Sequence, residues 1–517
     1  MAPLLLPTKS SMFRNGHFLI QIALFAVVVA VFSHTRADPD LWGHVRFGQD
    51  TVTAGALETI DGYSFLSDRP WINHEWLAEI LMYLAYAAGS GAGLILLKTA
   101  ILSLMLWVVV GSWPRGLPIR ATALMVGLLV IGTVPQANHV RPQLFSLLAF
   151  AVLLRILVRG AVTSREQLWR GVALMVLFAL WANLHGGWIV GVGTVGLWTA
   201  VELAIPAHRR DGVVMVYTGA AAFVATIATP YGPRLWQFLF RTVQFGREQI
   251  TDWQPVYALG SVYVGIWLLV TIVAMILIYR DHRAGSTDFR SIAVVMMLGA
   301  ASFQVNRLLA FFALAVTVLL TRALISLPRP AGTAARSAPA LTSVSRKPVY
   351  ERAAVAVAAV ITTVVLSGAL AVAYDNATCI RMEPTMFPEP EASLTVFDRG
   401  VRGRVLTWFD WGEYAIWHFS PAVSVSLDGR RETIYSDATV SQQFRFYFNP
   451  DERHRILEQI RPDYIWLPAH LEVTSALVAD GWTPIFSGPL SVLLGREPAG
   501  GAPIPAVPAA RRCFPGP

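Results

Sequence analysis

Eleven long apolar segments recur along the chain, and they constrain its fold more than any other feature of the sequence. A helix needs about 20 apolar residues to cross the ~30 Å core of a bilayer. On that basis the candidate spans are 17–34, 91–111, 119–134, 142–158, 168–184, 187–205, 213–229, 257–279, 291–303, 308–326 and 352–374. Only 14% of the residues are charged, whereas soluble domains have about 25%. The sequence therefore excludes a simple cytosolic enzyme and predicts a polytopic α-helical membrane protein with eleven spans.

The basic residues indicate how these spans are oriented. With the N-terminus inside, the inner segments hold 19 Lys/Arg and 5 Asp/Glu, and the outer loops before residue 375 hold 8 and 10. This distribution satisfies the positive-inside rule. We expect a protein of a bacterial inner membrane, with a cytoplasmic N-terminus and a periplasmic or extracellular C-terminal domain. The net charge of +8 then reflects orientation, and no nucleic-acid partner is expected.

Changes of composition predict four regions. Residues 1–326 form the transmembrane domain, whose first outer loop is 35–75. Residues 327–351, rich in Pro, Ala, Ser and Arg, are expected to be a cytoplasmic linker. The last span, 352–374, leads to a small outer α/β domain at 375–517.

The sequence pattern of the outer domain differs from that of the apolar spans. GRVLTWFDW, AVSVSLDG, DYIWLP and SVLLGR are typical of short strands, and HRILEQI and EVTSALVADG are typical of helices. Cys379 and Cys513 both belong to this domain. In an oxidising compartment they could form a disulfide that joins its two ends.

Polar residues gather where the predicted spans reach the outer face. They are Asp38, Asp40, His44, His74, Glu75, Asn138, His139, Arg141, Asn183, His185, Tyr231, Arg234, Gln304, Asn306 and Arg307. Polar groups at bilayer depth are costly and usually mark a functional cavity. We therefore expect the functional site on the outer face.

The segment after the first span carries an acidic pair followed by a histidine. Asp38 and Asp40 suit the start of a helix, as a cap and as a charge that favours the helix dipole. That explanation leaves out His44, which follows Asp40 by one turn on the same face. A carboxylate beside an imidazole could instead be a general base with its orienting partner, or two metal ligands.

Further along the same loop, His74 and Glu75 open an apolar helix that Gly89-Ser90-Gly91 interrupts. Residues 74–88 are too few to span, so we expect this helix at the surface, over the face that carries Asp40. Lys98 lies inside the next span. It either snorkels toward the interface or reaches a lipid phosphate from within the membrane.

Other outer turns offer phosphate and acceptor contacts. Arg141 and Arg307 could grip a phosphate through bidentate hydrogen bonds. Asn183 and His185 flank a turn whose two glycines permit close backbone approach, although an ordinary tight loop would look the same. In the outer domain, Asp428-Gly429 is typical of a turn. The less favoured alternative is that Arg430 or Arg431 contacts an acceptor.

Soluble-enzyme motifs do not compete with this set, because the sequence has no Walker loop, no GxGxxG after a strand and no HExxH. DPDLWGH (38–44) and PWINHEWL (70–77) resemble the loop motifs of the GT-C superfamily of membrane glycosyltransferases, which includes protein mannosyltransferases and lipid A aminoarabinose transferases. The resemblance covers residues 1–326. In place of a His-Pro-Pro pattern common among relatives, this chain has His74-Glu75-Trp76.

The resemblance implies a sugar donor carried on a polyprenyl phosphate and an extracytoplasmic acceptor, with inversion at the anomeric carbon. Asp40 or Asp38 would deprotonate the acceptor hydroxyl or help to hold a divalent metal such as Mg or Mn, with His44, His74 and Glu75 nearby. The expected donor-phosphate ligands are Arg141, Arg307, Lys98 and His185, and the expected acceptor contacts are Asn183, Asn306, Tyr231 and Arg430.

Two other function classes remain open at this stage. A transporter or flippase of lipid-linked sugars would also have many spans and polar outer residues, but should show inverted repeats and charges near the midplane. A non-catalytic envelope assembly protein would use the spans as an anchor, for which eleven are excessive.

Overall fold

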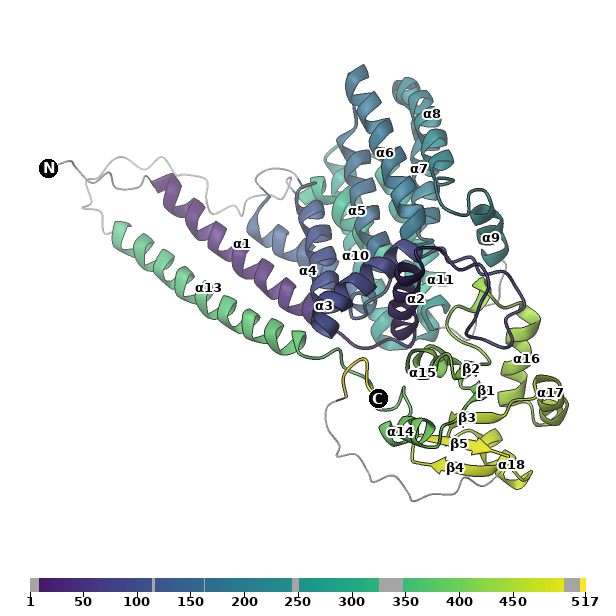
Figure 1. Ribbon diagram of the computed structural model, residues 1–517. Helices are drawn as coiled ribbons and strands as arrows, with labels where there is room; N and C mark the ends of the chain where they lie inside the picture. Colours follow the sequence, from purple (N-terminus) through teal and green to yellow (C-terminus); the bar gives the residue numbers. More distant parts are fainter. Residues whose placement is uncertain (1–8, 114–116, 162, 244–250, 325–346, 497–511) are drawn as a thin grey trace, which may run out of the picture.

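A helical bundle in the first part of the chain is followed by a sheet domain (Figure 1). The computed structural model describes residues 9–113, 117–161, 163–243, 251–324, 347–496 and 512–517. The predicted linker lies almost entirely outside these residues. The helices before the sheet domain are α1 (Lys9–Ser33), α2 (Leu41–Ala54), α3 (Trp76–Val110), α4 (Ile119–Ala137), α5 (Gln143–Arg159), α6 (Ser164–Leu184), α7 (Trp188–Ala204), α8 (Arg209–Ala225), α9 (Arg234–Val243), α10 (Ser261–Arg283), α11 (Phe289–Gln304), α12 (Leu309–Leu319) and α13 (Lys347–Ala377).

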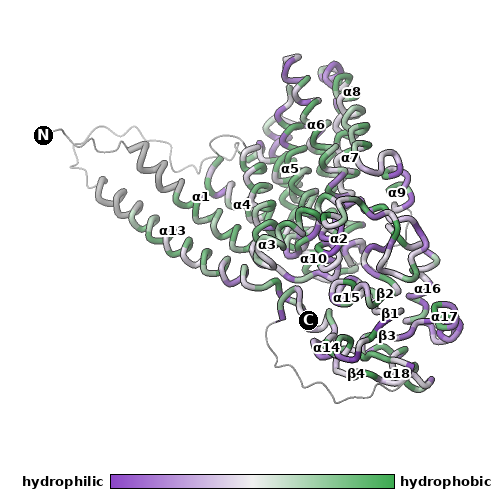
Figure 2. The backbone as a smooth tube through the Cα atoms, in the orientation of Figure 1, coloured by the Kyte–Doolittle hydropathy of each residue, from purple (hydrophilic) through white to green (hydrophobic). Residues whose placement is uncertain are grey.

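Each predicted apolar segment overlaps one of these helices, and residues 325–326 at the end of segment 308–326 lie outside the described residues. Among the described residues, five helices are long and apolar enough to cross a membrane, namely α3, α4, α6, α10 and the part of α13 from Ala356 to Ala377. A sixth crossing is counted if α7 and α8, which meet at a bend of 113°, form one broken span. Figure 2 shows hydrophobic residues along the helices and hydrophilic ones at their ends and in the sheet domain. The chain is thus a polytopic membrane protein, and its count of eleven spans stays a prediction.

Three helices deviate from a simple bundle. α1 and α13 pack against each other and lean away from the other helices (Figure 1). α3 is broken at Gly89 and Ser90, where the backbone leaves helical geometry, at the interruption that the sequence predicts. The part of α3 before this break carries Glu79, whose backbone lies against Gly48 of α2.

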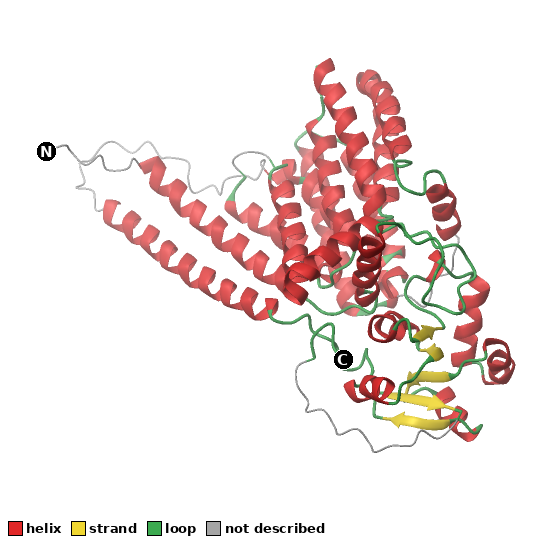
Figure 3. Ribbon diagram, in the orientation of Figure 1, coloured by secondary structure: helices red, strands yellow, loops and turns green. Residues whose placement is uncertain are grey.

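The sheet domain has five strands in the order β2-β1-β3-β5-β4 (Figure 3). They are β1 (Gly403–Thr407), β2 (Val423–Val425), β3 (Tyr464–Pro468), β4 (Thr483–Ser487) and β5 (Ser491–Gly495). β1 is parallel to β2 and β3, with Val405 opposite both Val425 and Tyr464, and β5 is antiparallel to β3 and β4. Helices α14 (Pro390–Asp398), α15 (Gly412–Phe419), α16 (Asp437–Phe448), α17 (Arg453–Ile460) and α18 (Glu472–Ala479) complete the domain.

All the strands and helices predicted for the domain are found, but the prediction misses several other elements. β1, β2, β3, β5, α17 and α18 coincide with the predicted segments. β4 was not predicted, because Thr483-Pro484 at its start suggests a turn and only a short apolar run follows. α14, α15 and α16 were also missed. The helical periodicity of α15 is hidden by an almost continuous run of buried residues.

The sheet domain shares a hydrophobic core with α2. Trp42 of α2 packs against Phe387, Tyr414 and Phe514, with ring centroids 4.8–5.4 Å apart. The edge strand β2 also receives the first outer loop, since Phe65 N–H donates to the Val425 carbonyl at 3.1 Å. Segments more than 350 residues apart in sequence therefore form one folding unit.

A disulfide closes this unit. Cys379, just after α13, is bonded to Cys513, 134 residues later. The bond holds a C-terminal segment whose Pro515 carbonyl accepts a hydrogen bond from Trp42 Nε1 at 2.8 Å. It thus ties the end of the last membrane helix, the sheet domain and α2 together.

Because the closed loop is long, losing this bond should enlarge the conformational freedom of the unfolded domain considerably. We expect Cys379→Ser to lower the free energy of unfolding by about 2–5 kcal/mol, measured by denaturant or thermal unfolding in detergent. Reductant should destabilise the wild type similarly and have no effect on a Cys379→Ser/Cys513→Ser variant. Equal stability of all forms would contradict the expectation.

Candidate functional site

A cavity of about 390 Å³ lies where the helical bundle meets the sheet domain. Its membrane-domain walls come from the start of α2, the segment before and within the first turn of α3, and the turns after α4, α6 and α11. The sheet domain contributes the start of α15 and the turn at 429–433. The cavity is therefore an interdomain site.

Eight of the thirteen predicted site residues line this one cavity. They are Asp40, His44, His74, Glu75, Arg141, His185, Arg307 and Arg430. They come from six separate stretches of sequence, so the fold brings together residues that the sequence could only assign to one face. Their chemical roles remain proposals.

Asp38, Arg141 and Asp252 form an ion-pair chain at the rim of the cavity. The Arg141 guanidinium contacts the buried Asp38 carboxylate and lies 2.6 Å from Asp252 Oδ2. Burial alone would raise the pKa of Asp38, but Arg141 and His139 lower it overall. Asp38 itself does not line the cavity. Its carboxylate instead fixes Arg141, which does line it.

Asp40 has a different environment from Asp38. Its carboxylate lines the cavity, and its Oδ2 is 3.9 Å from Arg141 Nη2. Burial and the neighbouring Asp38 raise the pKa of Asp40 to about 7. A carboxyl group with a pKa near neutrality can accept a proton and release it again at working pH.

Glu75 lies among three histidines. Its Oε1 is 3.5 Å from both His74 Nε2 and His185 Nε2, and its Oε2 is 4.0 Å from His44 Nδ1. Burial would raise the pKa of Glu75, but the nearby positive charges, with His74 first and then His44 and Arg307, lower it to about 2. The carboxylate is therefore ionised at neutral pH.

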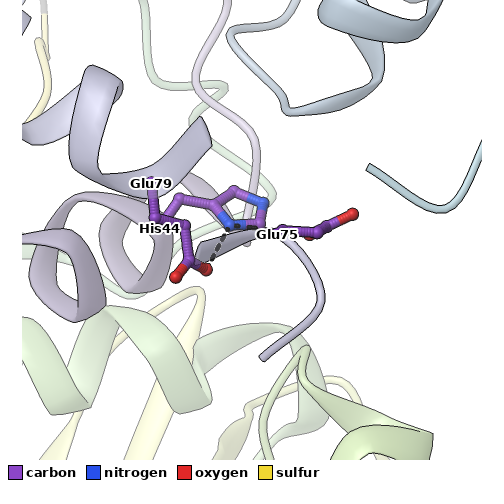
Figure 4. A group of neighbouring side chains, drawn as sticks. All are labelled: His44, Glu75 and Glu79. Carbon is purple, nitrogen blue, oxygen red and sulfur yellow. Dashed lines mark hydrogen bonds and ion pairs between the residues drawn. The ribbon is translucent and has the colours of Figure 1, made fainter. Parts of the chain in front are cut away.

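His44 is held by a second carboxylate, Glu79 (Figure 4). His44 Nδ1 is 3.1 Å from Glu79 Oε1, and the Asn73 amide donates to Glu79 Oε2 at 2.5 Å. Burial would lower the pKa of His44, but the hydrogen bond to Glu79 and the charge of Glu75 raise it to about 9. The imidazole is therefore protonated at neutral pH.

The same three side chains also have the spacing of a metal site. One atom each of His44, Glu75 and Glu79 lies within 4.8 Å of the others. One imidazole and two carboxylates form a donor set suited to a divalent cation. Binding would have to release the His44 proton. This group differs from the predicted metal pair, since Asp38 is bound by Arg141.

His185 and Arg307 form the side of the site toward the bundle. Arg307 Nη2 is 2.9 Å from His185 Nε2, and His185 Nδ1 is 2.7 Å from Ser146 Oγ. A guanidinium only donates, so Nε2 must be the unprotonated acceptor. Burial and Arg307 accordingly lower the pKa of His185 to about 3, so its ring is neutral and acts as a support for Arg307.

An apolar wall adjoins these polar groups. Ile189 and Val190 of α7, Leu239 of α9, and Leu308 and Phe311 near the start of α12 also line the cavity. The cavity therefore presents cations and carboxylates on one side and hydrocarbon on the other. Such an arrangement suits an amphipathic ligand.

Four other predicted residues lie outside the cavity lining. Lys98 is fully buried and donates to the carbonyls of His34 and Ala137 at 2.5 and 2.9 Å. Asn183 accepts from Trp76 Nε1 and donates to two carbonyls. The buried Asn306 has its backbone N–H bonded to the Gln254 carbonyl, and Tyr231 accepts from the Asn73 N–H. These contacts account for the positions of the four side chains, and the contact of Lys98 with a lipid phosphate stays a prediction.

Four acidic lining residues were missed from the sequence, namely Glu79, Asp252, Glu413 and Glu432. Glu79 follows Glu75 by four residues, a spacing that could have revealed it. Asp252 and Glu413 carry no local signal, because only the tertiary fold brings them beside Arg141 and Asp40.

Arg430 joins the two domains at the cavity wall. Its buried guanidinium donates to Asp428 of its own domain and, at 2.6 Å, to Asp61 of the first outer loop. It also lies 4.7–5.1 Å from the ring centroids of Phe47, Tyr63 and Trp71. The predicted acceptor contact by Arg430 is thus not needed to explain its position.

Removing this cation would leave two buried carboxylates unpaired. We expect Arg430→Ala to lower the free energy of unfolding by about 3–5 kcal/mol, measured by thermal or denaturant unfolding. Arg402→Ala, which removes an exposed arginine of the same domain, should have little effect. An unchanged stability of Arg430→Ala would show that the joint is not energetically important.

Comparison with known proteins identifies the fold. No family model and no curated protein sequence matches this chain. Among solved structures, ArnT from Cupriavidus metallidurans bound to undecaprenyl phosphate is similar over 94% of this chain and 99% of its own, with a TM-score of 0.54 and 15% identity. Its apo state gives a TM-score of 0.53, 14% identity, and coverage of 94% and 98%. These similarities show that the chain has the fold of the ArnT structures, a fold that agrees with the resemblance predicted from the sequence.

Proposed function

We propose that this protein is a membrane glycosyltransferase that moves a sugar from a polyprenyl-phosphate donor to a hydroxyl of an extracytoplasmic acceptor. The observation that carries the proposal is the convergence of Asp40, Arg141 and Arg307 in one cavity that also has an apolar wall. The similarity to ArnT, solved with undecaprenyl phosphate, supports the choice of donor lipid.

The donor phosphate belongs beside Arg307. This guanidinium is oriented by the neutral His185 and lies 5.6 Å from the Trp253 ring centroid. Arg141 is nearby but is already shared between Asp38 and Asp252. Arg307 is therefore the principal phosphate ligand in this proposal, and the polyprenyl chain lies along the apolar wall formed by α7, α9 and α12.

Asp40 is the general base. It takes the proton of the acceptor hydroxyl, whose oxygen attacks the anomeric carbon as the bond from that carbon to the phosphate oxygen breaks. The electron pair of that bond goes to the phosphate, where cations stabilise the developing charge. Direct displacement inverts the anomeric carbon. A divalent ion held by His44, Glu75 and Glu79 would add further electrostatic stabilisation of the leaving phosphate.

Replacing the base tests the assignment most directly. Asp40→Asn should abolish transfer, because an amide cannot accept the hydroxyl proton, while leaving the unfolding temperature near that of the wild type. Purified protein is incubated with radiolabelled undecaprenyl-phosphate sugars and cell-envelope acceptors, and labelled product is measured. Asp398→Asn, at an exposed carboxylate, is the matched control. Undiminished turnover by Asp40→Asn, or vesicle uptake of donor without transfer by the wild type, would refute the proposal.

The raised pKa of Asp40 also predicts a pH dependence. Below a pH of about 7 Asp40 becomes protonated and can no longer act as a base. We therefore expect kcat/KM to rise with pH up to about 7 and then to level off, and each pH unit below 7 should cost about tenfold. Steady-state transfer rates between pH 5 and 9 would show this limb. A profile that stays flat from pH 5 upward would exclude Asp40 as the titrating base.

A further inference from the structure

The Asp40 carboxylate lies against the backbone of the sheet domain at Gly429. Its ion pair with Arg141 is long, at 3.9 Å, whereas the same guanidinium contacts Asp38 closely. A Cβ atom placed on Gly429 would lie only 2.1 Å from Asp40 Oδ1. The bare backbone of Gly429 thus abuts the carboxylate and limits where it can point.

Glu413, in the first turn of α15, lies at the same place. The Cβ atom imagined on Gly429 would be 2.8 Å from Glu413 Oε1, and one placed on Gly43 would be 2.1 Å from Glu413 Oε2. Gly43 and Gly429, one from each domain, leave a space that contains the carboxyl groups of Asp40 and Glu413. Gly43 follows Asp40 by three residues at the start of α2, so a side chain at either glycine would displace one of the pair.

Within the described part of the chain, one carboxyl oxygen of Glu413 is not used by the fold. Its side chain is 3% exposed, and Oε2 has no hydrogen-bond partner. The other buried carboxylates near it do have partners: Asp428 is bound by Arg430 and Tyr435, and Glu79 by His44 and Asn73. A buried polar group without a partner is costly, so its retention indicates a function.

The raised pKa values of Asp40 and Glu413 agree with a close contact between their carboxyl groups. Burial and the charges of Asp40 and Asp428 raise the pKa of Glu413 well above its ordinary value, although Arg430 opposes the shift. Two carboxyl groups this close do not both ionise. A protonated Glu413 can donate a hydrogen bond to the Asp40 carboxylate rather than repel it.

We propose that the sheet domain is part of the catalytic site and that Glu413 is a positioning residue, which holds the Asp40 carboxylate toward the acceptor hydroxyl. The inference rests on the proposed function and extends it, because it makes docking of the second domain a condition for catalysis. Glu413 acts through Asp40 and does not contact the donor.

The test compares Glu413→Ala, Glu413→Gln and Gly429→Ala with the wild type, using the undecaprenyl-phosphate sugar that the wild type turns over. A carboxylate misplaced by about 1 Å can cost up to 100-fold in rate. We expect Glu413→Ala and Gly429→Ala to lower kcat by about 10- to 100-fold, with the donor KM unchanged. Glu413→Gln has the same shape and can donate a hydrogen bond to Asp40, so it should retain most of the activity.

Matched controls separate positioning from folding. Glu472→Gln changes an exposed carboxylate of the same domain, and Gly62→Ala adds a methyl group where nothing lies within 4 Å. Both should behave as the wild type, and all variants should keep its unfolding temperature.

The possible outcomes are distinct. Full kcat in Glu413→Ala, or a raised donor KM with kcat unchanged, would overturn the inference while leaving the proposed function intact. Loss of activity in Glu413→Gln equal to that in Glu413→Ala would also overturn it, because a positional role depends on shape and not on charge. A wild type that turns over no donor would overturn the proposed function first, and this inference with it.

Discussion

The buried guanidinium of Arg430 is the interaction on which the rest of the structure depends. Burying a cation is costly, and here two carboxylates and three aromatic rings offset the cost. Asp428 belongs to the sheet domain, and Asp61, Phe47, Tyr63 and Trp71 belong to the other domain. The joint therefore fixes one domain against the other, and with it the position of the neighbouring Gly429 at the cavity wall.

Inside the cavity, each ionisable group is controlled by its neighbours more than by its residue type. Two carboxylates two residues apart in the turn before α2, one lining the cavity and one beside it, show this clearly. Asp38 is bound by Arg141 and has a lowered pKa, while Asp40, farther from the same arginine, has a raised one. The histidines differ in the same way, since His44 beside Glu79 is protonated and His185 beside Arg307 is neutral. This small region thus combines carboxyl groups of different pKa with one protonated and one neutral imidazole, so that each group can take a different chemical role.

Much of the architecture was predictable because the bilayer imposes simple rules. Apolar length indicated the helices, and Gly89-Ser90 marked the break in α3. The concentration of polar residues at one set of helix ends predicted a functional site on that face, and seven of the fifteen residues line the cavity. Lys98 shows where this reasoning stops, since a buried lysine in a span satisfies two backbone carbonyls as well as it would satisfy a lipid phosphate.

What could not be predicted depends on docking between distant segments. Glu413 occurs in an aromatic stretch that is typical of a domain core, and most of α15 is indeed buried. Its position beside Asp40 follows only once α15 lies on α2. Asp252 likewise carries no signal of its own, because its partner Arg141 is 111 residues away.

The position of Gly429 against Asp40 has a consequence for how the protein is made. These residues are almost 390 positions apart. The cavity therefore cannot be complete until the sheet domain, which supplies one of its walls, has been synthesised. Contacts so distant in sequence are slow to form, because a long loop must close before they stabilise anything. The membrane helices can therefore be inserted while the site is still incomplete, and the cavity is finished only when the sheet domain has folded on the same side of the membrane as α2. Maturation of the site is thereby a late event, separate from membrane insertion.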